Sequence, residues 1–300
     1  MTADPSDRTI ILHLLRGAVP ERANRISSLW TQYGPTVEVT PNGRGMTMNA
    51  NASRIKLDTK MIDFFWLFGF SAWRSINVYS GALEFATRNG HPLATALKDD
   101  TALGQYELDY KQHITIAQSL IAAEQTDNIC WPADIPRPTD DRYSLSNDQH
   151  KAAFDLVALA LAFAILHEFR HVMYCSDKSA PTALPEEEIA CDTWARDFMT
   201  SKLAFYAKTQ DHTYDQVLQK RAMGIALAAV TVHVMTPSYA HWGNGQYPPI
   251  AERLTALIKG YNLPPDSCFW AFTACLLIAL MRKDHRPLDI VCATTVRSTR

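Results

Sequence analysis

Several features are scarce in this 300-residue sequence, and each scarcity excludes a class of protein. There are only six cysteines and no C-x-x-C pair, which favours reduced, buried thiols in a cytoplasmic protein over a disulfide framework. The formal net charge is −2, which argues against a nucleic-acid partner bound mainly through its phosphate backbone. The 47% hydrophobic and 20% charged fractions are those of an ordinary globular protein, with length enough for two domains or one large one.

Long uninterrupted hydrophobic runs are also missing. The apolar run 152–166 contains Asp155 and leads into charged residues, and the run 268–281 is shorter than the ~20 residues that span a bilayer. The N-terminal MTADPSDRTI begins polar and lacks the basic-then-apolar order of a signal peptide. We therefore expect no membrane partner, no targeting segment and a cytoplasmic location.

Strands are expected only in the N-terminal half. TVEVT (36–40) and MTMNA (46–50) flank the turn-forming run Pro41–Gly45, which predicts a hairpin. SRIKLD (53–58) can add a third strand.

Helices are expected almost everywhere else. Their predicted ranges are 20–33, 61–76, 103–124, 147–175, 185–208, 214–235, 249–259 and 264–283. Thr59 is the predicted cap of the helix 61–76, and either Asn147 or Asp148 caps the helix that runs to about 175. The proline-rich stretch 131–146 is the best boundary. The predicted class is α+β, mostly α, with an N-terminal α+β subdomain at 1–145, strands at about 36–58, and a helical subdomain at 146–300.

One helix carries the motif H-E-x-x-H at His167, Glu168 and His171. Two histidines four residues apart lie on the same helix face, so both imidazoles can bind one metal ion. Glu168 can then accept a proton from a metal-bound water and pass it to a leaving amine. The alternative is a pair of buried core histidines beside a solvated glutamate. With ten His and ten Glu in the chain, chance explains the motif poorly.

A catalytic zinc site needs a third protein ligand and an open fourth position for water. Glu188 and Asp192 follow on the next predicted helix and share a face, because they are four residues apart. We expect Glu188 to bind the metal and Asp192 to accept a hydrogen bond from a ligand imidazole. Glu187 is the reserve ligand, and placing it on the metal puts Cys191 one turn away. Acidic residues after Pro185 also suit a helix N-terminus without any metal.

Weaker candidates surround this set. Cys175, one turn beyond His171, is either a further ligand or a packing residue. Arg253 is either a buried pairing group or a solvated one. A hydrogen-bond donor to the developing oxyanion is also needed, and His241 is the candidate we name first. The other donors considered are Tyr174, His233 and Tyr247.

These motifs resemble those of known metallopeptidases. The pair H-E-x-x-H and E-x-x-x-D resembles the zincins of the gluzincin type, in which the later Glu is the third zinc ligand. Residues 167–199 are similar to the Lit-type phage-exclusion peptidases of bacteria. YPPIAER (247–253) resembles an H-P-P-x-x-x-R stretch of related metallopeptidases, with Tyr247 where the His stands.

The resemblance implies a zincin-like fold and a cytoplasmic zinc endopeptidase that cleaves a specific intracellular protein in phage defence. Zincins place an edge strand above the metal, and an extended substrate pairs with that strand. The resemblance makes 36–40, 46–50 and 53–58 candidates for it; such short strands are equally ordinary structure, and the sequence does not choose among them. A translation factor is the implied substrate, and an activating peptide or phage component is the implied trigger. The sequence leaves open three other interpretations: a regulatory protease that cleaves a repressor, a metal-binding protein without protease activity that serves as a scaffold or senses a partner, and an interaction module without metal. It also leaves the metal open, because two His and one carboxylate can hold iron, cobalt or manganese.

Overall fold

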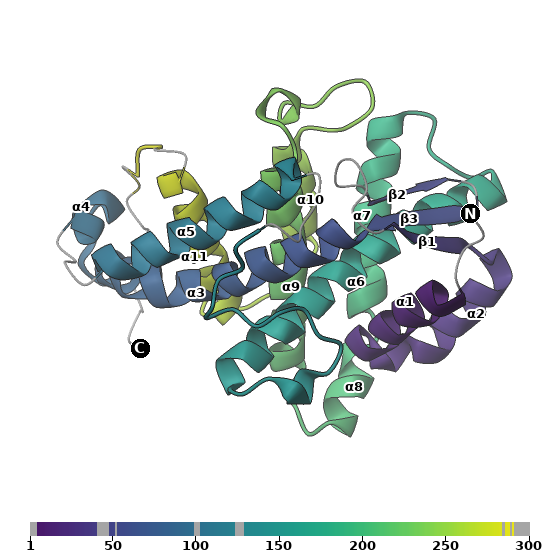
Figure 1. The fold of residues 1–300 in the computed structure, drawn as a ribbon, viewed down its shortest axis with the longest axis horizontal. Helices are drawn as coiled ribbons and strands as arrows, with labels where there is room; N and C mark the ends of the chain where they lie inside the picture. The colour runs from purple at the N-terminus through teal and green to yellow at the C-terminus, as the bar shows by residue number, and fades with distance from the viewer. Residues whose placement is uncertain are drawn as a thin grey trace, which may run out of the picture.

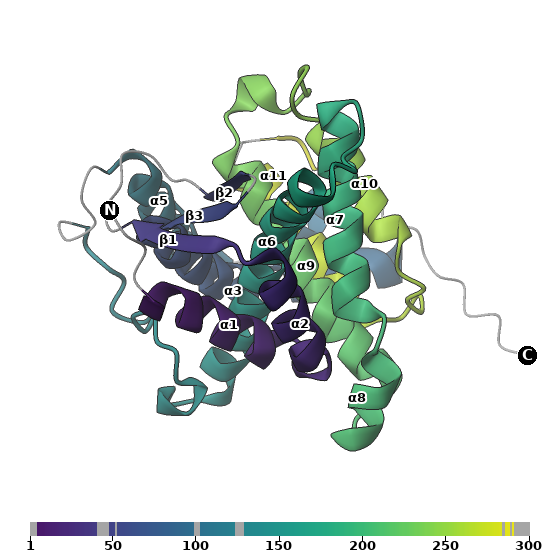
Figure 2. The same cartoon turned by 90° about the vertical axis from the view of Figure 1, so that its right-hand side faces the viewer.

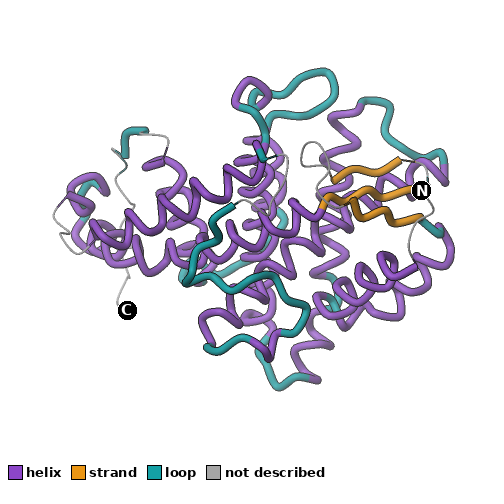
Figure 3. The backbone as a smooth tube through the Cα atoms, viewed as in Figure 1, coloured by secondary structure: helices purple, strands orange, loops and turns teal. Residues whose placement is uncertain are grey.

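The computed structural model describes residues 5–40, 48–51, 53–98, 103–123, 129–283, 286–288 and 290. The described chain is mostly helical with one small sheet near its N-terminus, so the predicted α+β, mostly α class is confirmed. The sheet lies at one end of the molecule and α4 lies at the other (Figure 1, Figure 3). In chain order the elements are α1 (Pro5–Ala18), η1 (Pro20–Arg22), α2 (Ala23–Tyr33), β1 (Thr36–Thr40), β2 (Met48–Asn51), β3 (Arg54–Asp58), α3 (Thr59–Asn89), α4 (Leu93–Lys98), α5 (Leu103–Ala122), η2 (Arg142–Ser144), α6 (Asp148–Asp177), α7 (Leu184–Thr200), α8 (Leu203–Thr209), α9 (Tyr214–Met235), η3 (Ser238–Ala240), α10 (Ile250–Lys259) and α11 (Cys268–Lys283).

The sheet corrects the predicted hairpin. The strand order is β1-β3-β2, with β1 parallel and β2 antiparallel to β3. β3 takes the centre because Ile55 and Leu57 are buried on it, and Val37 of β1 is buried directly beside Ile55. The predicted turn at 41–45 lies outside the described residues. β2 is therefore an edge strand of the described sheet, and it lies against α6 (Figure 2).

Helix α6 is the central element of the fold. Its start is set by Asn147, whose Oδ1 accepts a hydrogen bond from the backbone N–H of His150. α6 packs against α3, α7 and α9, and also against β2 and β3. Two glycines allow the close crossings, because a Cβ at Gly69 of α3 would overlap Val157 and a Cβ at Gly224 of α9 would overlap Leu159. The tight packing fixes the helix that carries H-E-x-x-H.

The N-terminal segment is tied to this helical core. Arg221 of α9 forms a buried ion pair with Glu21 of η1 at 2.9 Å. Trp30 of α2 stacks on Phe169 of α6, with ring centroids 5.0 Å apart. Buried residues of the expected subdomains 1–145 and 146–300 belong to one hydrophobic cluster. The division near residue 145 stays a prediction.

Several predicted helix limits need correction. α3 is capped by Asp58, which accepts from the N–H of Lys60, and not by Thr59; the helix continues to Asn89. The predicted helix 185–208 is two helices, α7 and α8, separated at Ser201 and Lys202. α1 and α4 were not predicted. By contrast, α9 spans the predicted range, and α6 begins at its predicted cap.

The cysteines and the long apolar helices were also subjects of expectations from the sequence. The five described cysteines are all free, but only Cys191 and Cys275 are buried; Cys130, Cys175 and Cys268 are exposed, contrary to expectation. By length and composition alone, α6 and α9 could cross a membrane. However, 67% and 61% of their apolar windows are buried inside the molecule, as in the core helices of a soluble protein, so this is weak evidence for a span.

Candidate metal centre

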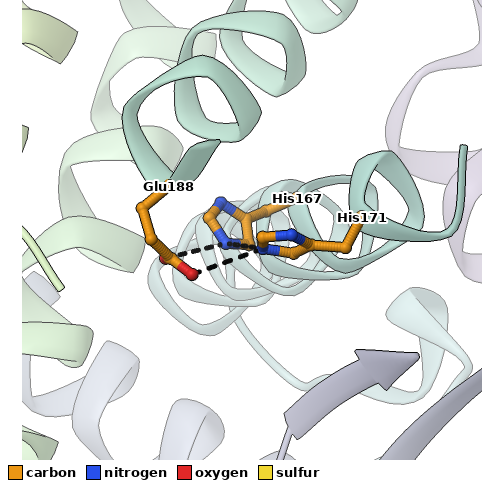
Figure 4. A group of neighbouring side chains, drawn as sticks. All are labelled: His167, His171 and Glu188. Carbon is orange, nitrogen blue, oxygen red and sulfur yellow. Dashed lines mark hydrogen bonds and ion pairs between the residues drawn. The ribbon is translucent and has the colours of Figure 1, made fainter. Parts of the chain in front are cut away.

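The two histidines of α6 meet at their Nε2 atoms. His167 and His171 lie one helical turn apart, and their Nε2 atoms are 3.2 Å from each other (Figure 4). His167 is only 7% exposed. Figure 4 shows both rings turned toward the carboxylate of Glu188 on the neighbouring helix α7. The H-E-x-x-H spacing thus brings the two imidazoles together, and the metal ion between them stays a prediction.

Helix α7 supplies the carboxylate. It begins after a short connection in which Lys178 adopts a left-handed conformation, and Pro185 occupies its first turn. The two oxygens of Glu188 lie 3.4 Å from the Nε2 atoms of His167 and His171. Two ligands of one tetrahedral zinc ion, each bound at about 2.0–2.1 Å, lie about 3.3–3.4 Å apart. The separation of the two Nε2 atoms, and the distance from each of them to its own Glu188 oxygen, are therefore close to the spacing of ligands around such an ion.

Asp192 holds the far side of His167. The ring Nδ1–H donates to Asp192 Oδ1 at 2.9 Å, and Asp192 is 2% exposed. Arg253 of α10 donates from Nε and Nη2 to the two Asp192 oxygens at 2.7 and 2.8 Å. Its Nη1 also lies 3.5 Å from Glu188 Oε2. Of the two roles left open for Arg253, the structure shows the buried pairing group.

Glu187 makes a different contact from Glu188. Its Oε1 accepts a hydrogen bond from His171 Nδ1–H at 2.7 Å, on the side of the ring away from His167. The Cys191 Sγ lies 3.6 Å from the same nitrogen. His171, Glu187 and Cys191 thus form a second group of potential metal donors among the described residues. The 2.7 Å separation is that of a charge-assisted hydrogen bond and is too short for two ligands of one ion.

The pKa values of the ionisable side chains at this site are shifted, because these groups are shielded from water and lie beside one another's charges. Burial would raise the pKa of Glu188, but hydrogen bonds from His167 and His171 hold that pKa well below its usual range. Burial also opposes charge on His167, yet its hydrogen bonds to Asp192 and Glu188 raise its pKa to about 10. For Glu168, burial dominates and the pKa is raised. Glu168 therefore holds a proton more readily than an ordinary glutamate.

The remaining candidates lie in different surroundings. Tyr174 stacks under Arg170, whose guanidinium lies 4.1 Å from the ring centroid, and Cys175 is exposed and belongs to neither described donor group. His241 packs on His233, and its Nε2–H points at the backbone oxygens of His233 and Thr236 at 3.1 and 2.8 Å. These two histidines secure the connection between α9 and α10.

Tyr247 differs from the other donor candidates. Burial raises the pKa of its phenol, and the charges of Glu188 and Glu168 raise it further, so the ring lies within the field of the metal centre. The loop is held by Asn244, whose Oδ1 accepts from the N–H groups of Gln246 and Tyr247 at 2.8 and 2.9 Å. Tyr247 is 44% exposed, so its side chain is accessible to solvent.

Three contacts of this group of residues were not predicted from the sequence. The hydrogen bond from His171 to Glu187 was not foreseen, because Glu187 was considered only as a metal ligand. The contact of Cys191 with His171 had one available signal, the four-residue spacing from Glu187. The role of Arg253 had no local signal, since 61 positions separate it from Asp192.

Comparison with protein families gives one match. The family model for peptidase U49 matches residues 55–273, which include most of β3, all of α6, α7 and α10, and all the residues of the candidate metal centre described above. No curated protein and no solved structure matches the chain. The matched segment covers well over half of the sequence, and the chain accordingly belongs to the peptidase U49 family.

Proposed function

We propose that this peptidase is a zinc-dependent endopeptidase that holds its metal through His167, His171 and Glu188. The observation that carries the proposal is the facing pair of Nε2 atoms. Each Nδ1–H is engaged by a carboxylate, Asp192 or Glu187, so both rings turn their Nε2 atoms toward each other, at 3.2 Å, and toward Glu188. A bound cation would take the place of the Nε2 protons that hydrogen-bond to Glu188, because a histidine binds a metal as the neutral imidazole, and Glu188 would complete the ligand set.

The chain's own residues supply the acid–base chemistry. A bound zinc ion would polarise the scissile carbonyl and lower the pKa of a water molecule. Glu168, next to His167 and partly buried, has its pKa raised by desolvation, which favours proton uptake by its carboxylate. It accepts the proton of the attacking water and delivers it to the leaving amine. Asp192 and Arg253 keep the His167 ring fixed meanwhile.

The edge strand β2 gives an extended substrate a place to pair. β2 is bonded to β3 on one side only within the described sheet, and it packs against the helix that carries both histidines. An unpaired strand edge can add a peptide as a further strand. We therefore assign β2, out of the three candidate strands, as the one that aligns the substrate.

The oxyanion donor is better supplied by Tyr247 than by His241. The His241 Nε2–H is directed at two backbone oxygens, whereas the solvent-accessible Tyr247 lies in the field of Glu168 and Glu188. Its raised pKa keeps the phenol protonated, as a hydrogen-bond donor requires. Tyr247→Phe should lower kcat about 10²- to 10³-fold with bound zinc unchanged. Tyr239→Phe is the matched control, because that side chain is 83% exposed; equal loss in both variants would contradict the assignment.

The decisive experiment compares the wild-type chain with Glu168→Gln and His167→Ala. Zinc content is measured by elemental mass spectrometry, and cleaved proteins are identified by mass spectrometry of new N-termini in cells that express each form. Glu168→Gln should keep one zinc per chain and lose cleavage at least about 10²-fold, because it removes the proton acceptor. His167→Ala should lose the zinc.

Glu186→Gln is the matched control, since Glu186 is exposed on α7 and its substitution should leave zinc and cleavage unchanged. Undiminished cleavage by Glu168→Gln would refute the catalytic assignment. Zinc without cleavage in the wild type, even after infection by phage, would favour the non-proteolytic metal protein.

The substrate and setting follow from the resemblance stated for residues 167–199. We propose an intracellular protein as substrate, a translation factor first, with cleavage in phage defence and activation by a peptide or phage component. The new N-termini from infected and uninfected cells test this directly. Cleavage of a repressor instead would identify a regulatory protease.

A further inference from the structure

The proposed zinc site leaves one carboxylate without a function. Glu187 directly precedes the ligand Glu188, yet it does not face the two Nε2 atoms. Its side chain is only 14% exposed, and it bonds to the opposite nitrogen of His171 at 2.7 Å. A partly buried carboxylate in such a contact restricts the ring, whether or not an ion is bound.

The two ligand imidazoles are held in the same way. Asp192 accepts the Nδ1–H of His167 at 2.9 Å, and Glu187 accepts the Nδ1–H of His171 at 2.7 Å. Both acceptors, like Glu188, project from α7, while both histidines project from α6. One helix therefore supplies a ligand together with the partner of each of the other two ligands.

We propose that Glu187 is a positioning residue, which fixes the tautomer and orientation of His171 so that Nε2 carries the lone pair offered to the metal. The assignment rests on the proposed zinc site and deepens it. The carboxylate also makes the imidazole a stronger electron donor, because a charged acceptor stabilises developing positive charge on the ring. Glu187 thus contributes to metal affinity without touching the ion.

The test measures zinc affinity of the full-length protein by competition with a chromogenic chelator. Glu187→Ala removes both the hydrogen bond and the charge, and should weaken zinc binding about 10- to 100-fold. Glu187→Gln keeps an acceptor oxygen, so its loss should be smaller than that of the alanine variant. Glu186→Gln is the matched control for the same chemical change on the exposed side of α7 and should bind as the wild type does.

A second readout separates positioning from general damage. The visible spectrum of the cobalt-substituted protein reports the symmetry of the ligand set, and it should change in Glu187→Ala while circular dichroism and thermal unfolding of the metal-free form do not. Wild-type affinity and spectrum in both Glu187 variants would overturn the proposal. So would complete loss of metal in Glu187→Gln together with retention in Glu188→Gln, because Glu187 would then be the ligand.

The outcomes keep this proposal distinct from the proposed function. If the wild type binds no zinc, the zinc peptidase itself is refuted, and the Glu187 assignment falls with it. If the wild type binds zinc and the Glu187 variants bind it as tightly as the Glu186→Gln control, the zinc site stands and the positioning role alone is rejected.

Discussion

Arg253 is the residue that balances the buried charge of the metal centre. It binds both oxygens of Asp192 and lies near Glu188, and Asp192 has almost no contact with water. Burial would raise the pKa of Asp192, but the charge of Arg253 lowers it, so the carboxylate stays ionised. Without that cation, Asp192 would be a buried charge bonded to one imidazole only.

Arg253→Ala should therefore destabilise the protein strongly. Removing one partner of a buried ion pair costs about 3–5 kcal/mol, because the other charge is left without compensation. The free energy of unfolding in urea measures the effect. Arg54→Ala is the control, since its ion pair with Glu38 is solvent-exposed and should be worth less than about 1 kcal/mol. Similar losses in the two variants would show that Asp192 does not depend on Arg253.

At the scale of elements, the position of α6 depends on two helix crossings. Gly69 and Gly224 have no room for a methyl group, because Val157 and Leu159 of α6 fill the space. Elsewhere in α3, Gly81 has no neighbouring atom within 4 Å of an added Cβ. The same substitution should therefore have opposite effects at the two kinds of position.

Gly224→Ala should lower the free energy of unfolding by about 1–3 kcal/mol, since the overlap with Leu159 forces α9 away from α6. Gly81→Ala should raise it by about 0.5–1 kcal/mol, because alanine restricts the unfolded chain and favours the helix. Urea unfolding of both variants checks the pair. Stabilisation by Gly224→Ala would mean that the two helices are not in close contact.

At the scale of the whole molecule, the features that could be predicted from the sequence are those determined by residues close together in the chain. α6 and α9 were predicted because the signals that determine them are local: the structure has Asn147 as the cap of α6 and Thr213 as the cap of α9, each next to the helix that it starts. The H-E-x-x-H geometry was predictable because a helix fixes the spacing of its own residues.

Features that depend on distant segments were not predictable. The predicted strand order was wrong because β1 pairs with β3, and no local sequence pattern indicates that pairing. Glu187 and Glu188 are neighbours in the same helical turn, so their spacing did not show which carboxylate contacts Nδ1 of His171 and which contacts Nε2. The choice between them depends on how α7 packs against α6.

The distances along the chain within the metal centre have a consequence for synthesis on the ribosome. His167 and Asp192 are 25 positions apart, whereas Asp192 and Arg253 are 61 apart. All the proposed ligands, and the carboxylates that bond to the two imidazoles, lie on the consecutive helices α6 and α7. The ribosome therefore completes this helical pair, with every proposed ligand, before it makes Arg253, the cation that pairs with Asp192. Because short loops close at lower entropic cost, that helical pair is the part of the centre expected to assemble first. Until α10 emerges, a bound metal ion is what neutralises its carboxylates, so we expect metal supply during translation to affect how much of the protein matures.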